Sequence, residues 1–157
     1  MKTRAITGVL TALALAASLS AQAQVKIGVI ASSTGPTAFV GIPQKNSVAM
    51  LPKKVGNLDI EYIVYDDASD PTQSVQLTKK LLTEHKVDAL VGPSGSANAM
   101  GVLQVMAEAQ APMLAPVGTS AVVLPMDDKK RWAFKTHPND DVISGGIVAA
   151  MTKRGVK

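Results

Sequence analysis

The chain has 157 residues, of which 46% are hydrophobic, 18% charged and 3% aromatic, and it contains no cysteine. That length favours one domain, or one domain and part of a second, and the composition excludes a disulfide-stapled mini-protein, a charge-rich disordered tail and sites built on cysteine thiolates. The formal net charge of +4 would fall by two, to +2, without Lys2 and Arg4 at the N-terminus, which is too little for a nucleic-acid-binding surface.

The first 23 residues have the three parts of a secretory signal peptide. Lys2 and Arg4 form a positively charged start, residues 5–17 are mostly apolar and uncharged, and an A-x-A sequence ending at Ala23 offers the small side chains that signal peptidase requires. The apolar stretch is shorter than the ~20 residues that span a bilayer, which argues against a membrane anchor. We predict cleavage between Ala23 and Gln24 and export of a soluble protein to a bacterial periplasm.

Short apolar runs rich in β-branched residues recur along the mature chain. They cover residues 25–30, 60–65, 87–91, 112–115 and 132–135. Runs of this length and composition are typical of strands buried on both faces. They alternate with helical stretches, so the sequence predicts right-handed βαβ units and an α/β fold, a parallel sheet with helices on both faces.

Four stretches have helical patterns. Residues 42–51 form a short helix that Pro52 ends, Asp70 and Pro71 begin the next as N-cap and first-turn residues, Ser96 opens a third, and residues 139–141 cap a fourth. Apolar spacing places the following side chains in the core: Met50, Val75, Thr78, Leu82, Met100, Leu103, Met106, Ala107, Met113, Val142, Ile143, Gly146, Ile147, Ala150 and Met151.

The last residues, 154–157, resemble a helix end followed by the start of another strand. A parallel sheet would need that strand to be complete. We therefore expect the sequence to be truncated.

Loops of small and hydroxyl-bearing residues follow three of the predicted strands, at 32–37, 92–98 and 116–120. Ligands of open α/β sheets bind at the carboxyl ends of strands, where loops run into helix N-termini. Free N–H groups at a helix start and nearby hydroxyls suit an anionic oxygen, so two such loops at matching positions favour a carboxylate site. Ordinary turn and N-cap chemistry explains either loop taken alone.

Five segments in order carry a resemblance to a known family. They are residues 25–30 (VKIGVI), 33–36 (STGP), 65–71 (YDDASDP), 91–96 (VGPSGS) and 115–119 (APVGT). Behind a signal peptide, they are similar to the leucine/isoleucine/valine-binding proteins, which are type I periplasmic solute-binding proteins of ABC transporters. The resemblance covers the whole mature chain.

The resemblance implies two α/β lobes that are joined by a hinge and close around an amino acid. Residues 24–135 would form the N-terminal lobe, and residues 136–157 a helix at the start of the crossover to a second lobe beyond Lys157. The family takes an acidic partner for the ligand ammonium and several aromatic residues from that second lobe. The return segments that complete the first lobe would also lie there.

The matching loops imply roles for particular residues. Ser96 would bind the ligand carboxylate through its hydroxyl and N–H, Val117 would accept from the α-ammonium through its carbonyl, and Thr119 would bind polar ligand atoms through its hydroxyl. The other implied ligand contacts are Ser94 and Gly95 in the first loop and Gly118 in the second, with Phe39 and Val40 as the pocket wall where the family often has an aromatic residue.

The implied function is capture of a branched-chain amino acid or similar small carboxylate and its delivery to an inner-membrane ABC permease, with no cofactor, metal or catalytic residue. Relatives of this kind also bind amides and aromatic acids, and the same lobes serve in ligand-sensing subunits. Since one lobe contacts only one side of a ligand, we expect this chain to bind much more weakly than a full-length relative.

An exported α/β hydrolase is the enzyme alternative, and it would need Ser94 or Ser96 to pair with His85 or His137. The G-x-S-x-G, P-loop and H-E-x-x-H patterns are absent from the sequence, and the two histidines lack metal-ligand spacing. The adjacent acids at 66 and 67 fit a solvated turn better than a catalytic pair or a metal site. The basic run 129–131 fits a solvated turn, and Trp132 fits packing at a strand start.

Overall fold

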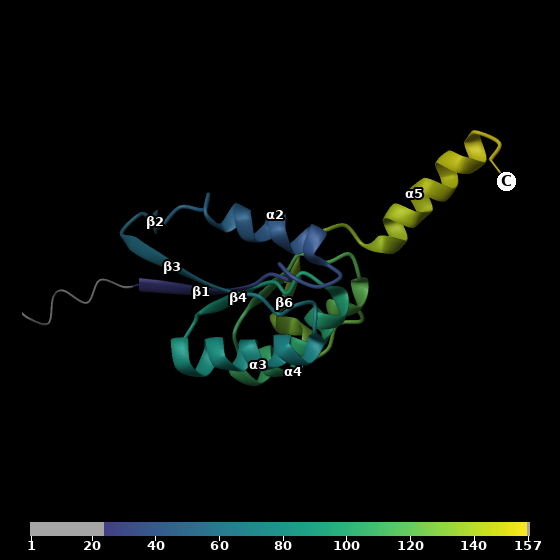
Figure 1. Ribbon diagram of the computed structural model, residues 1–157. Helices are drawn as coiled ribbons and strands as arrows, with labels where there is room; N and C mark the ends of the chain where they lie inside the picture. Colours follow the sequence, from purple (N-terminus) through teal and green to yellow (C-terminus); the bar gives the residue numbers. More distant parts are fainter. Residues whose placement is uncertain (1–23, 157) are drawn as a thin grey trace, which may run out of the picture.

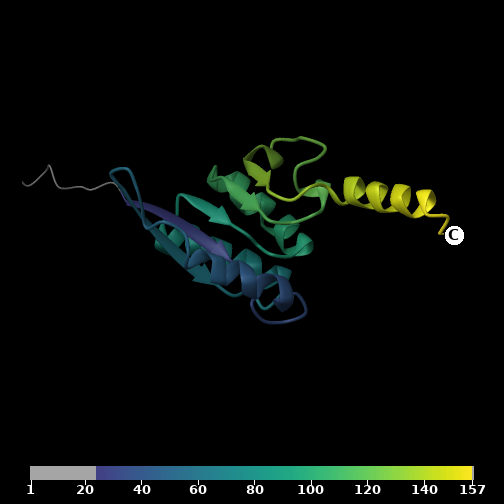
Figure 2. The same cartoon turned by 90° about the horizontal axis from the view of Figure 1, so that it is seen from above.

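The computed structural model describes residues 24–156 (Figures 1 and 2), so the predicted signal peptide lies outside the described residues. The strands are β1 (Gln24–Ile30), β2 (Lys54–Val55), β3 (Leu58–Tyr65), β4 (Ala89–Val91), β5 (Met113–Ala115) and β6 (Ala133–Lys135). The helices are α2 (Ala38–Val48), α3 (Pro71–Lys80), α4 (Ser96–Ala109) and α5 (Asp140–Lys153), with a π-helical turn at Leu81–His85 and 3-10 turns at Ser120–Val122 and Lys130–Trp132. Among residues 24–156, every helix is too short or too polar to cross a bilayer.

The six strands form one sheet in the order β2-β3-β1-β4-β5-β6. All neighbours are parallel except β2, which pairs antiparallel with β3. The predicted α/β fold is therefore confirmed, and each predicted strand is present within two residues of its expected bounds. The two-residue strand β2 was not predicted, because its sequence has no apolar run.

Helices α3 and α4 cover one face of the sheet and enclose the main core (Figure 1). Asp70 caps α3 as expected, with its carboxylate accepting from the N–H groups of Thr72 (2.6 Å) and Gln73 (3.1 Å). Most side chains predicted to face this core do so. Met100 is the exception, because its position on α4 turns it away from the sheet. The largest buried apolar residues of the core are Ile30, Leu81, Leu90, Val102, Met106 and Met113.

Helix α2 covers part of the opposite face, over β1 and β3 (Figure 1). It begins four residues earlier than expected and ends before Met50, which is 86% exposed and not in the core as predicted. Further along the same face, Leu114 on β5 and Phe134 on β6 are 39% and 56% exposed. Helices therefore lie on both faces, but they leave the β5–β6 end of this one open.

Helix α5 projects away from the rest of the protein in both views (Figures 1 and 2). All its residues are exposed, so the predicted inward face of Val142, Ile143, Gly146, Ile147, Ala150 and Met151 is wrong for the described part of the chain. The apolar spacing identified a helix correctly, but no described segment packs on it. Asn139 occupies the N-cap position without a capping hydrogen bond from its side chain.

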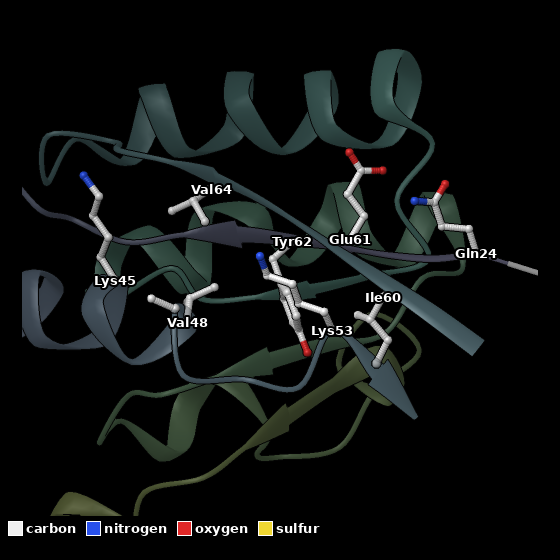
Figure 3. Close-up of a pocket in the computed structure, with 9 residues that line it drawn as sticks. Gln24, Lys45, Val48, Lys53, Ile60, Glu61, Tyr62 and Val64 are labelled. Carbon is white, nitrogen blue, oxygen red and sulfur yellow. The ribbon is translucent and has the colours of Figure 1, made fainter. Parts of the chain in front are cut away.

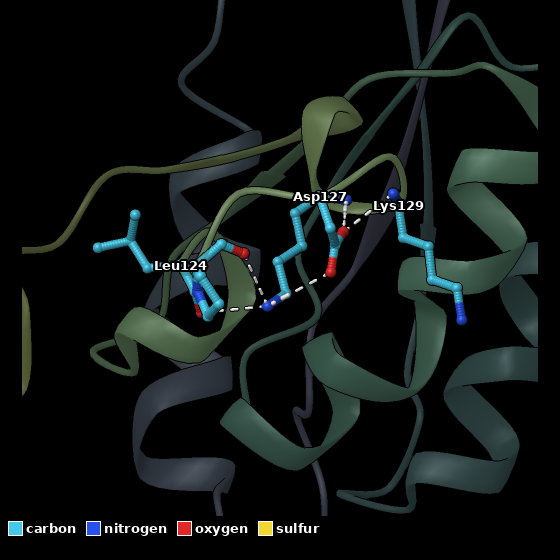
Figure 4. Close-up of polar contacts among 5 residues, drawn as sticks. Leu124, Asp127 and Lys129 are labelled. Carbon is cyan, nitrogen blue, oxygen red and sulfur yellow. Dashed lines mark hydrogen bonds and ion pairs between the residues drawn. The ribbon is translucent and has the colours of Figure 1, made fainter.

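The turn before β6 is organised by Asp127 (Figure 4). Its carboxylate accepts from the N–H groups of Lys129 (3.0 Å) and Lys130 (2.9 Å), and the Lys130 ammonium donates to the carbonyl of Leu124 (3.1 Å). The hydrogen bond from the Lys130 N–H is the largest influence on the pKa of Asp127, which is lowered from its ordinary value. The basic run was predicted to be solvated, which holds for its exposed first and last residues. Lys130 instead folds back and closes the turn.

Candidate functional site

The two loops singled out in the sequence leave the same edge of the sheet side by side. Strands β4 and β5 are parallel neighbours, with Val91 opposite Leu114, and the loops follow directly after these strands. The first loop starts at Gly92, whose backbone φ is +104° and where a Cβ would lie 2.1 Å from the carbonyl oxygen of Ile30. Glycine at this position therefore lets the loop pack directly against the end of β1.

The first loop ends at the start of α4. Gly95 is the N-cap and Ser96 is the first helical residue, with an exposed side chain. Ser94 is only 7% exposed, and its hydroxyl donates to Gln44 Oε1 (2.5 Å) and accepts from the N–H of Ser32 (3.1 Å). The two serines therefore differ. Ser96 faces solvent beside the free N–H groups of a 14-residue helix, whereas Ser94 joins this loop to α2 and to the loop after β1.

The second loop is anchored by a buried side chain and by hydrogen bonds to its backbone, and it leads into a short 3-10 turn. Val117 is 3% exposed, so its side chain is anchored in the core. The carbonyl of Gly118 accepts from the Lys135 ammonium (2.9 Å) and from the N–H of Asp140 (3.0 Å). Thr119 is half-buried, and its hydroxyl accepts from the N–H of Ala121 (3.2 Å) at the start of the 3-10 turn. A helix N-terminus was expected after this loop, and the three-residue 3-10 turn takes its place.

Asp66 connects the loop after β3 with the loop after β1. Its Oδ1 accepts from the N–H groups of Ala68 (2.9 Å), Ser33 (3.0 Å) and Thr34 (3.3 Å). Partial burial raises the pKa of Asp66, but these hydrogen bonds favour the carboxylate and together lower its pKa below the ordinary value of 3.8. The role is structural, since three backbone donors from two loops converge on one carboxylate oxygen.

Asp67 lies on the other side of the same turn and is fully buried. Its carboxylate accepts from the Ser74 hydroxyl (2.5 Å), the Asn98 amide (2.7 Å) and the N–H of Ser69 (3.1 Å). The expectation that both acids solvate a turn is therefore wrong for Asp67. Asn98 stands two residues after Ser96, so this buried network also fixes the start of α4.

Two hollows open on the α2 face of the sheet. The smaller, about 200 Å³, adjoins the candidate loops and is lined by residues at the carboxyl ends of strands, Ala31, Gly92 and Pro116, and by Gln44 from α2. The larger, about 580 Å³, lies toward the opposite edge, where Lys45 and Val48 reach it from α2 and Ile60, Tyr62 and Val64 from β3 (Figure 3). None of the predicted ligand residues lines either hollow. The smaller hollow is the one next to them, because Gly92 and Pro116 are the first residues of the two candidate loops.

The remaining predicted residues lie beside the sheet edge that carries the two candidate loops, or away from it. Val40 is half-buried in the first turn of α2, whereas Phe39 is 79% exposed. His85 lies before β4 and is bonded to the Tyr65 hydroxyl (2.8 Å), so the whole strand separates it from Ser96. Within residues 24–156, no cluster of three or more acidic or histidine side chains is arranged to hold a metal ion.

Sequence reasoning missed three residues that shape the site: Gln44, Asn98 and Lys135. Each acts through a contact between segments, and two of them bridge positions 50 and 31 residues apart in the chain. The sequence gives one local signal for these contacts, the Asp70-Pro71 helix start. It predicts the helix α3 that carries Ser74, the hydrogen-bond partner of Asp67.

Comparison with known proteins gives the family. The profile of the family described as "Periplasmic binding protein" matches residues 24–157. The Leu/Ile/Val-binding protein homolog 6 of Brucella abortus is 33% identical over 94% of this chain and 39% of its own length. The chain thus spans well under half the length of this curated relative.

Solved structures agree with the sequence relatives. An extracellular ligand-binding receptor from Rhodopseudomonas palustris HaA2 is 40% identical and has a TM-score of 0.83, over 85% of this chain and 37% of that one. A solute-binding protein of an ABC transporter from Rhodopseudomonas palustris, solved with 4-hydroxybenzoate, is 30% identical with a TM-score of 0.64, over 74% of this chain and 32% of that one. The chain therefore belongs to the periplasmic binding protein family.

Proposed function

We propose that this chain supplies one ligand-binding wall of the periplasmic solute-binding component of an ABC transporter. The ligand class is an amino acid of the branched-chain type or a similar small carboxylate. The bound solute is delivered to an inner-membrane permease. The family membership and the names of the relatives support this role and the periplasmic location.

The observation that carries the proposal is the pairing of β4 with β5. This pairing brings the loop ending at Ser96 and the loop containing Thr119 to one edge. Ser96 is exposed at the first turn of α4, where N–H groups without helical partners attract a carboxylate. The neighbouring loop adds the carbonyl of Val117, which can accept from an ammonium, and the hydroxyl of Thr119, which can donate to a second ligand oxygen.

An aromatic acid is the second candidate ligand. The solute-binding protein from Rhodopseudomonas palustris that was solved with 4-hydroxybenzoate supports it. A branched-chain amino acid has an α-ammonium and 4-hydroxybenzoate has none. The carbonyl of Val117 would therefore be used only by the amino acid, whereas the carboxylate site at Ser96 serves both ligands.

The test is a titration of the chain with leucine, valine and 4-hydroxybenzoate. Calorimetry measures the dissociation constants, and changes in amide chemical shift locate the binding site. We expect dissociation constants near the millimolar range, about 4 kcal/mol, because one wall makes only part of the contacts that give micromolar affinity at about 8 kcal/mol. Shifts should concentrate at 94–97 and 117–119. Micromolar affinity in this chain would overturn the one-wall proposal, and saturating shifts at the larger hollow alone would overturn the site.

Two variants sharpen this titration. Ser96→Ala and Thr119→Ala should each weaken binding by about tenfold, which is the effect of losing one hydrogen bond to a charged group. Thr83→Ala is the matched control, because Thr83 is exposed and lies before β4, at the opposite edge. If the parent chain hydrolyses an ester at a measurable rate and Ser96→Ala abolishes that activity, the hydrolase alternative would be favoured. Adjacent kinase genes, in place of permease and ATPase genes, would favour a sensing subunit.

A further inference from the structure

The side chain of Lys135 has an arrangement that the proposed binding role does not require. Lys135 is the last residue of β6, and its side chain is half-buried. Its ammonium donates to the carbonyl of Gly118 (2.9 Å), to the carbonyl of Pro138 (3.3 Å) and to Asn139 Oδ1 (2.6 Å). An ammonium has three donors, so all three are used, and every acceptor is an uncharged oxygen.

These acceptors belong to two separate loops, one after β5 and one after β6. Gly118 belongs to the second candidate loop, and residues 138–139 lead into α5. The N–H of Asp140, the first residue of α5, also donates to the Gly118 carbonyl (3.0 Å). Lys135 and the start of α5 therefore meet on a single carbonyl oxygen of the candidate site.

Glycine at position 118 leaves room for the side chain of Asp140. A Cβ at position 118 would overlap the carboxylate of Asp140, with a separation of 1.9 Å from Oδ1. The rest of α5 is exposed along its whole length. Within residues 24–156, the hydrogen bonds around Gly118 and Lys135 therefore hold the start of the helix against the loop after β5.

We propose that Lys135 is a positioning residue that fastens the loop of Val117, Gly118 and Thr119 to the start of α5. The side chain sets the direction of α5 relative to the sheet. This inference depends only on the contacts around Lys135 and Gly118 and not on the identity of a ligand.

The experiment measures the direction of α5 with and without the three donors. The chain has no cysteine, so cysteines introduced at Gln76 on α3 and Ala149 on α5, both exposed, can carry spin labels whose separation is measured by pulsed electron paramagnetic resonance. Lys135→Met keeps the apolar stem and removes the donors, whereas Lys135→Arg keeps charge and donors. Lys129→Met is the matched control, because Lys129 is exposed on the turn before β6.

We expect a narrow distance distribution in the parent chain and in the Lys129→Met variant. Lys135→Met should broaden it about twofold, because a helix held at one end loses its direction when that contact opens. Lys135→Arg should stay close to the parent. The narrow distribution of the parent should also persist in high salt, since the acceptors of the Lys135 ammonium are uncharged. A Lys135→Met variant that remains folded, with the parent distribution, overturns the proposal.

A second pair of variants decides the matter if Lys135→Met does not fold. Gly118→Ala should shift or broaden the distribution, because its methyl group displaces the Asp140 carboxylate. Gly118→Ala combined with Asp140→Ala should restore the parent distribution, since the room returns and the N–H of residue 140 is kept. Failure of the double variant to restore it, in a folded chain, contradicts the proposed arrangement.

The ligand arm separates this inference from the proposed function. Leucine and 4-hydroxybenzoate are each added at concentrations that saturate the amide shifts. A change in mean distance in the parent that Lys135→Met abolishes supports both proposals. A broadened Lys135→Met distribution with no effect of either probe supports the positioning role and counts against the proposed ligands. If the distance distribution of Lys135→Met is as narrow as that of the parent, the positioning role is contradicted, with or without an effect of leucine or 4-hydroxybenzoate.

Discussion

The two faces of the sheet bury equivalent residues to very different extents. Leu90 on β4 points toward α3 and α4 and is fully enclosed, whereas Leu114 on the neighbouring strand β5 points the other way and stays more than a third exposed. Both leucines lie in short parallel strands of the same apolar character. The difference comes from what is packed above them, two helices on one face and only the side of α2 on the other. Stability should therefore reside mainly on the α3–α4 face.

The two leucines give the largest expected effect. Leu90→Ala should lower the free energy of unfolding by about 3 kcal/mol, because it removes buried methyl groups and leaves a cavity. Leu114→Ala removes the same atoms from a site that already contacts water, and it should cost less than about 1 kcal/mol. Denaturant unfolding followed by circular dichroism measures both. Equal losses would contradict the assignment of the core to one face.

The buried polar network on the α3–α4 face should be nearly as sensitive. Asp67→Ala would leave the Ser74 hydroxyl, the Asn98 amide and one backbone N–H without an acceptor in the interior. We expect a loss of about 2–3 kcal/mol, since each buried unsatisfied group has a desolvation cost. Asp128→Ala, at an exposed position in the turn before β6, is the control and should change stability by no more than about 0.5 kcal/mol. Similar losses in the two variants would show that Asp67 is not buried in solution.

The same comparison explains how far the sequence could predict the structure. The strands and the helices α3 and α4 follow from local signals, namely apolar runs and the Asp70-Pro71 start, and the core-facing side chains of the two helices were predicted with the exception of Met100. The expectation of strands buried on both faces is wrong for β5 and β6, where Leu114 and Phe134 are exposed. The other errors of burial concern Met50 and α5, where apolar spacing indicates a helix but contains no information on whether anything packs against it. Apolar spacing is a property of a single segment, whereas the burial of its side chains requires a second segment that packs against it.

The candidate site divides in the same way. The position of its two loops at one edge was predictable, because parallel neighbouring strands end at the same side of a sheet. The contacts that shape the loops were not, since Gln44 meets Ser94 and Lys135 meets Gly118 only through the tertiary fold. The adjacent acids illustrate the limit: their sequence predicts a turn, but only the packing of α3 and α4 decides that Asp67 turns inward and Asp66 outward.

Asp66 offers the smallest effect, and its sign follows from its lowered pKa. Backbone N–H groups hold the folded carboxylate in its charged form, so the unfolded chain binds the proton more readily. The stabilisation is therefore complete well above the ordinary pKa of 3.8 and is lost as the pH falls through the lower pKa of the folded state. The stability difference between the parent and Asp66→Asn should be about 1 kcal/mol near neutral pH, a modest value because solvent screens the group. It should shrink toward zero as the pH falls below 3.8 and through the lower pKa of the folded state. Denaturant unfolding at a series of pH values measures this difference. A difference that persists or grows in acid would mean that Asp66 stabilises the turn by packing, and the outward-facing acid would then resemble its buried neighbour.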